Sequence, residues 1–157
     1  MIGVAEWHPM VVHFPLALDI TGALTLSAAR FKAAGRHGAA LAMVGTWNIC
    51  LGAIGALVAV GTGLAAVASV DLDPAARIAM GLHVKWAVFA TIGLLLIAAW
   101  RSAGNDADSR PSRLFLGILW AVTVTLVVTG YRGGQNVYRY GIGVAPRTAS
   151  SDLPASK

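Results

Sequence analysis

Charged side chains are scarce in this chain: Asp, Glu, Lys and Arg together make up 12% of its 157 residues. Soluble domains carry about 25% charged residues, which they need to cover their surface. Hydrophobic residues make up 57% of the chain, so most of its surface must face an apolar solvent. The composition therefore excludes an ordinary water-soluble domain and predicts an integral membrane protein whose main partner is the lipid bilayer.

Other features are also missing. The chain has one cysteine, Cys50, which excludes an intrachain disulfide. Its 12 Lys and Arg residues are spread among apolar blocks and form no patch suited to nucleic acid. No hydrolase, P-loop, dinucleotide-binding or paired-carboxylate motif is present, so we expect no independent catalytic activity.

Four apolar blocks are long enough to cross a bilayer, which takes about 20 residues. They are Met10–Ala29, a stretch within Ala39–Ser69, Ala76–Trp100 and Leu114–Tyr131. Short polar connections make consecutive helices antiparallel neighbours, so residues 1–144 are predicted to form an all-α, up-down-up-down four-helix membrane bundle. Asp73 and Pro74 predict the N-cap and first residue of the third helix. Residues 145–157 are expected to be a disordered tail.

The stretch that follows the fourth block, Gly130–Val144, contains five glycines among tyrosines and arginines. Glycine disfavours helix, so this stretch is predicted to be a Gly/Tyr/Arg-rich loop after the last helix. Two interpretations stay open for it. One is an aromatic belt whose arginines contact phosphate head groups. The other is a loop folded back over the neighbouring membrane face, with Arg132 and Arg139 binding haem propionates or another anion.

Alternation of the four spans collects three of the four histidines at one membrane face. That face holds His8, His13, His83, Arg132, Tyr138 and Arg139, whereas His37 lies opposite. The short loops with most Lys and Arg lie on the opposite side, which favours that side as cytoplasmic. We therefore expect the histidine face and both termini to be periplasmic.

His13 and His83 each lie roughly 5–10 Å inside their predicted helix ends. The first and third spans run parallel and can face each other across the core, so these two imidazoles suit axial ligation of a haem iron. The alternative is that each histidine only hydrogen-bonds a carbonyl or an acid. His8, which precedes Pro9, is expected beside the ligands at the interface.

Met10 and Met80 each stand three residues before one of these histidines, in Met10-x-x-His13 and Met80-x-x-His83. Residues three apart share a helix face, and thioether with imidazole is a donor set that copper(I) accepts. Ordinary core methionines are the alternative. Asp19 is rotated about 120° from His13, so it is expected either to serve proton movement or to bond a Thr or Ser of a neighbouring helix.

The two ends of the apolar region carry long motifs. They are His8-Pro9-x-x-Val12-His13-Phe14-Pro15 and Gly130-Tyr131-x-Gly133-Gly134-x-x-Val137-Tyr138-Arg139-Tyr140-Gly141. With Thr62-Gly63-Leu64, they resemble a bacterial membrane family catalogued as domain of unknown function 2231. Relatives often carry an acidic residue soon after that tripeptide, where this chain has Ala65 and Ala66.

The resemblance implies a four-helix protein of the bacterial inner membrane that works near periplasmic c-type cytochromes. It brings no settled activity, so no catalytic residue is carried over. Three functions stay open. The first is a b-type haem electron-transfer subunit with His13 and His83 as ligands. The second is a non-catalytic subunit or assembly factor of a respiratory complex, as part of a homo-oligomer or with other subunits. The third is a copper-handling membrane protein.

Overall fold

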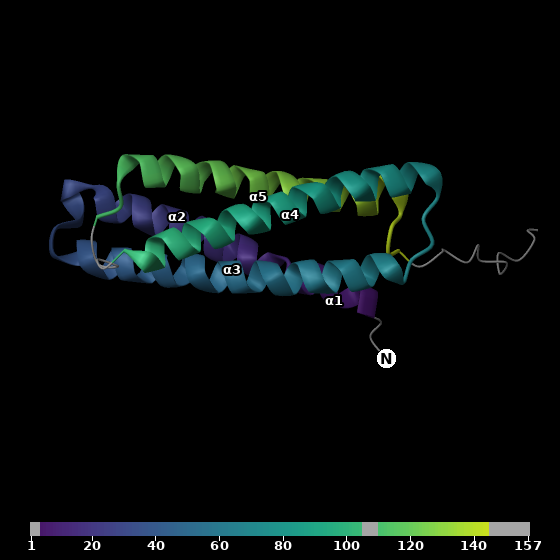
Figure 1. Cartoon of the computed structure of the whole chain (residues 1–157), viewed down its shortest axis with the longest axis horizontal. Coiled ribbons are helices and arrows are strands. Elements are labelled where there is room, and N and C mark those ends of the chain that lie inside the picture. Colours follow the sequence, from purple (N-terminus) through teal and green to yellow (C-terminus); the bar gives the residue numbers. More distant parts are fainter. Residues whose placement is uncertain (1–3, 105–109, 145–157) are drawn as a thin grey trace, which may run out of the picture.

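The computed structural model describes residues 4–104 and 110–144, and the predicted tail lies outside these residues. Its helices are α1 (Val4–Val11), α2 (His13–Arg30), α3 (Gly38–Ala68), α4 (Pro74–Ala103) and α5 (Arg113–Tyr140), with a short 3-10 helix over Lys32–His37 (Figure 1). The backbone N–H of Val12 donates to the carbonyl of His8 at 3.1 Å, so α1 and α2 form one span. This gives four spans.

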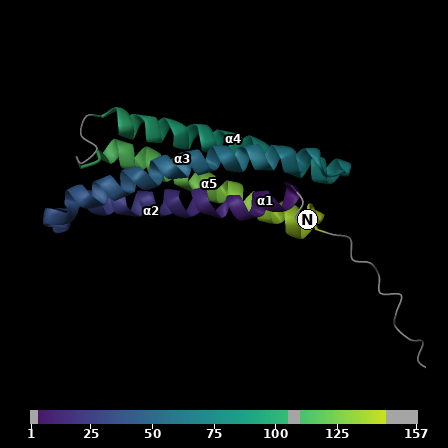
Figure 2. The ribbon, with the colours of Figure 1, turned by 90° about the horizontal axis from the view of Figure 1, so that it is seen from below.

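The four spans lie lengthwise beside one another (Figures 1 and 2). Within the described residues, α2 contacts α3 and α5, and α4 contacts the same two helices. The first span is therefore diagonal to the third across the bundle, and the second is diagonal to the fourth. The predicted up-down-up-down four-helix bundle is confirmed.

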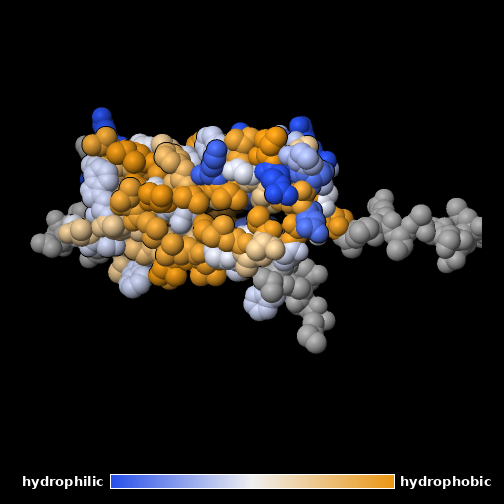
Figure 3. Space-filling view, turned by 45° about the vertical axis from the view of Figure 1, so that its right-hand side comes forward, coloured by the Kyte–Doolittle hydropathy of each residue, from blue (hydrophilic) through white to orange (hydrophobic). Residues whose placement is uncertain are grey.

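All four spans are long and apolar enough to cross a membrane. Their outer surface carries large exposed hydrophobic side chains, among them Ile54, Phe89 and Leu96. Figure 3 shows this apolar surface over most of the length of the bundle. Such a surface is stable only against lipid, so the chain is a multi-pass membrane protein.

The start of α4 follows the sequence prediction. The carboxylate of Asp73 accepts a hydrogen bond of 2.8 Å from the backbone N–H of Ala76, and Pro74 is the first helical residue. Asp73 satisfies one of the N–H groups left unpaired at a helix start, and proline has no N–H to lose there.

The predicted Gly/Tyr/Arg-rich loop after Tyr131 is wrong, because α5 continues to Tyr140 and ends at Gly141 with a φ of 62°. Glycine is tolerated better in membrane helices than in soluble ones, and packing can override helix propensity. Gly133 shows the reason here, since an added Cβ would lie 3.1 Å from Cε1 of His83. The glycine lets the ring approach α5 closely.

The core of the bundle is uneven along its length. One half, residues 15–30, 38–59, 90–103 and 113–129, which we call the packed half, holds the fully buried side chains of Leu26, Ile49, Leu94 and Leu119. We call residues 7–14, 60–68, 74–89 and 130–140 the histidine half. Among these residues, only Ala76 and Asn136 are buried. The large buried apolar side chains that hold the helices together therefore lie in the other half of the molecule.

Candidate functional site

The rings of His8 and His83 meet in the histidine half. Their centroids lie 6.4 Å apart and their planes are inclined by 77°. His8 belongs to α1 and His83 to α4, which are parts of two diagonally opposed spans. The pair therefore reaches across the middle of the bundle, where the core of apolar side chains is absent.

Each ring is anchored through Nδ1 to a backbone carbonyl of another helix. Nδ1 of His8 donates to the carbonyl of Ala59 on α3 at 3.0 Å, and Nδ1 of His83 donates to that of Thr129 on α5 at 3.2 Å. Because a carbonyl only accepts, Nδ1 carries the hydrogen in both rings. In the neutral ring, Nε2 then keeps its lone pair, which is the form an imidazole needs to bind a metal.

Two glycines make room for the two rings. A Cβ added at Gly63 on α3 would lie 2.9 Å from Cε1 of His8. A Cβ added at Gly133 on α5 would lie 3.1 Å from Cε1 of His83. The arrangement has an approximate symmetry, in which the first and third spans supply the rings and the other two supply a carbonyl and a glycine each. All four spans contribute to the site.

His13 lies elsewhere. Its side chain is exposed, and its Nδ1 donates to the carbonyl of Pro9 at 2.6 Å, within the same span. The structure thus brings His83 together with His8, the histidine that sequence reasoning assigned to the interface. The sequence signal for this was rotation around the helix: His8 and His13 are five residues apart, or about 500° at 100° per residue, so both cannot face the core.

The four residues of the suggested copper site also separate. Met10 is 71% exposed, like its neighbour His13. Met80 is half-buried and its sulfur accepts a hydrogen bond of 3.6 Å from Nδ2 of Asn136, close to His83 along α4. Within residues 4–104 and 110–144, no three His, Cys, Asp or Glu side chains form a group that could hold a metal ion. In this part of the chain, two imidazoles come together, those of His8 and His83.

The arginines and tyrosine expected near the histidines lie along the last turns of α5. Tyr138 is 91% exposed and Arg139 is exposed as well. Arg132 instead reaches towards α4, where its guanidinium lies 5.5 Å from the ring centre of Trp86. Its Nε is buried and has no hydrogen-bond partner. Of these three side chains, Arg132 alone is placed to contact a ligand inside the described fold.

Asp19 is fully buried at the border between the two halves. The hydroxyl of Thr123 on α5 interacts with its carboxyl group, but neither carboxyl oxygen has a hydrogen bond of good geometry. Thr123 itself donates to the carbonyl of Leu119 at 3.0 Å. The expected neighbour from an adjacent helix is therefore present, while the hydrogen bond to it is not.

Comparison with known proteins gives one match. The model of the family described as "Predicted membrane protein (DUF2231)" matches residues 6–146. No curated protein and no solved structure matches the chain. The matched segment covers all four spans and both histidines of the pair, so the chain belongs to this family.

Proposed function

We propose that this member of the DUF2231 family is a b-type haem-binding electron-transfer subunit, in which His8 and His83 would hold the haem iron. The observation that carries the proposal is the pair of opposed rings, each with its Nδ1 already bonded to a carbonyl. Haem sites in helical bundles are built in the same way, from side chains on facing helices.

The spacing of the rings fits one metal held between them. Bonds from a metal to imidazole nitrogen are about 2.0 Å, so two opposed ligands place their ring centres roughly 6 Å apart. The separation of 6.4 Å is close to this value. Direct aromatic contact covers about 4.5–7 Å and includes it too. The anchored Nδ1 atoms favour a metal, because they leave the metal-binding nitrogen of both rings available.

Two further features fit a flat, bulky ligand beside the rings. The histidine half lacks a close-packed core. Arg132 has a buried Nε without a partner, which suits a carboxylate such as a haem propionate. Arg139 and Tyr138 are exposed and contribute less to this fit than Arg132.

When bound, the haem would supply reversible one-electron transfer. The protein's own residues would set the conditions for it. The carbonyls of Ala59 and Thr129 fix the ring tautomers and make Nε2 more basic. A c-type cytochrome at the periplasmic face is the partner we propose.

The test is the absorbance spectrum of the detergent-purified protein, oxidised and dithionite-reduced, with iron and copper counted per chain. We expect about one haem per chain with a low-spin spectrum. His8→Ala and His83→Ala should each lose that spectrum, and His13→Ala, the matched control, should keep it. Size-exclusion elution of each variant checks that it still folds.

Other outcomes would overturn the proposal in distinct ways. About one copper ion per chain without iron would indicate a copper-handling protein that uses the same imidazoles. Neither metal, despite haem supply during expression, would leave a non-catalytic subunit or assembly factor. Loss of the spectrum in His13→Ala and His83→Ala, but not in His8→Ala, would restore the ligand pair expected from the sequence.

The proposal includes the orientation of the protein in the membrane, with the histidine half at the periplasmic face, and this orientation can be tested separately. In a Cys50→Ser background, single cysteines at Ser69 and Arg110 lie in loops at opposite ends of the bundle. A membrane-impermeant maleimide applied to intact cells should label Ser69→Cys and not Arg110→Cys. The reverse pattern would put the histidine half in the cytoplasm.

A further inference from the structure

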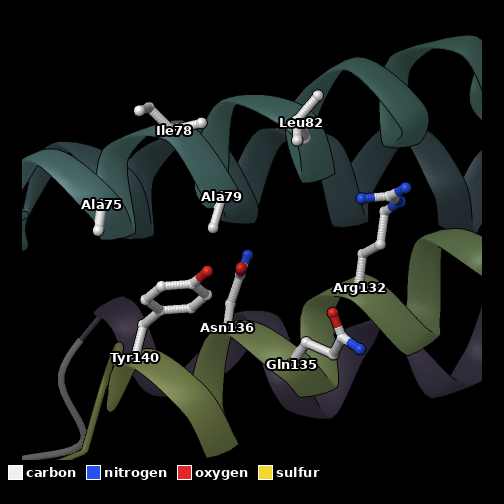
Figure 4. Close-up of a pocket in the computed structure, with 8 residues that line it drawn as sticks. All are labelled: Ala75, Ile78, Ala79, Leu82, Arg132, Gln135, Asn136 and Tyr140. Atoms are coloured by element: carbon white, nitrogen blue, oxygen red, sulfur yellow. The ribbon is translucent and has the colours of Figure 1, made fainter.

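A groove runs between α4 and α5 on the histidine half (Figure 4). Its volume is about 290 Å³. One wall is aliphatic and comes from the first turns of α4: Ala75, Ile78, Ala79 and Leu82. Ile78 is 70% exposed, so a ligand in the groove could contact this wall.

The other wall is polar and comes from the last turns of α5. Arg132, Gln135, Asn136 and Tyr140 line it, and Figure 4 shows Arg132 reaching across towards α4. None of the lining residues is acidic. The Nε–H of Arg132 is buried without an acceptor, although the guanidinium lies over Trp86. An unsatisfied cationic donor with no acid beside it calls for an anionic acceptor.

The depth of the groove in the membrane limits what the anion can be. α4 has 30 residues and α5 has 28, so each is more than 40 Å long at about 1.5 Å per residue. The hydrocarbon layer is about 30 Å thick, so the ends of both helices extend into the head-group layer. The groove starts at those ends and runs inwards to Leu82 and Arg132, each eight residues or about 12 Å from its helix end. A long arginine side chain can reach from that depth towards a lipid phosphate.

We propose that this groove binds an anionic phospholipid, with Arg132 donating to the phosphate and an acyl chain lying along the aliphatic wall of α4. The aliphatic wall favours a lipid over free phosphate, because an acyl chain would cover Ile78 and Leu82 and a free anion would not. A lipid phosphate and a haem propionate would compete for Arg132, so this inference assigns the arginine to the lipid and leaves the haem proposal resting on the histidine pair.

The experiment compares two lipids on delipidated protein. Phosphatidylglycerol or phosphatidylcholine is added to the purified full-length chain in detergent, and the bound lipid is counted by native mass spectrometry. We expect wild-type protein to retain phosphatidylglycerol in preference to phosphatidylcholine. Arg132→Gln should bind phosphatidylglycerol about fivefold more weakly, the usual effect of one basic residue near anionic lipid. Arg132→Lys should lose less.

The matched control is Arg139→Gln, which removes the same charge from the same end of α5 but outside the groove. It should leave phosphatidylglycerol binding within twofold of wild type. Ile78→Asn tests the aliphatic wall and should weaken binding while Arg132 is intact.

Each of four results would overturn the proposal. Equal losses in the two arginine variants would mean diffuse attraction to the positive helix end. Equal binding of the two lipids would mean that no anion is selected. Displacement of the lipid by inorganic phosphate at a similar concentration would point to a free-anion site. Loss of haem from Arg132→Gln with lipid binding unchanged would assign this arginine to a propionate.

Discussion

The two halves of the bundle use small residues for opposite purposes. In the packed half, a Cβ added at Gly45 would lie 2.6 Å from Cγ of Leu26, so the glycine brings two helices into direct contact. In the histidine half, Gly63 and Gly133 bring helices close to imidazole rings instead. Close backbone approach stabilises helix pairs in lipid. The comparison indicates that the packed half stabilises the fold and that the histidine half holds the site.

The largest expected effect tests the packed half. Leu119→Ala removes a fully buried side chain of the core and should lower the free energy of unfolding by about 2–5 kcal/mol. Leu114→Ala on the same helix removes an exposed side chain and should change it by less than about 0.5 kcal/mol. Thermal unfolding in one detergent measures both. Similar losses would show that the packed half has no special role in stability.

The next effect tests the histidine half. Gly133→Ala places a methyl group against His83, whereas Gly134→Ala meets no atom within 4 Å. We expect the first variant to bind haem at least about tenfold more weakly, as changes around metal ligands commonly do, and the second to bind like wild type. The His83 ring resonances in NMR spectra of the haem-free protein should shift in Gly133→Ala only. Two variants that behave alike would mean that the space beside the ring has no function.

The smallest effect tests the border between the halves. Asp19 is buried and neither of its carboxyl oxygens has a hydrogen bond. Asp19→Asn breaks no hydrogen bond and keeps the size of the side chain. It should therefore change the free energy of unfolding by less than about 1 kcal/mol. Haem content should also stay unchanged. A loss of about 3 kcal/mol or more would show that Asp19 is part of a buried ion pair or hydrogen-bond network.

Much of the fold could be predicted from the sequence, because the physics behind it is local. Uninterrupted apolar blocks of about 20 residues fix the four spans, and short connections fix their order. Asp73 and Pro74 mark a helix start by their own chemistry. The end of α5 could not be found in this way. The glycines there are explained by the His83 ring packed against Gly133, which is a contact between distant parts of the chain.

Only part of the candidate site could be predicted, because it too depends on contacts between distant parts of the chain. Three histidines were expected at one end of the bundle, and the structure has two of them together there. Depth along the axis, which favoured His13, does not report which way a side chain points. His8 was expected at the interface because it precedes Pro9, yet Pro9 lies inside α1, so His8 is helical and its ring bonds to α3. The groove beside Arg132 depends on how α4 and α5 pack, which no local pattern encodes.

One measurement tests most directly whether His8, and not His13, binds the iron opposite His83. It is the midpoint potential of the haem, followed by absorbance, in His8→Met and His13→Met beside the wild type. Methionine can replace histidine as an axial ligand and raises the potential when it does. We predict a raised potential in His8→Met and an unchanged one in His13→Met. A raised potential in His13→Met alone, or wild-type behaviour in both, would contradict the account.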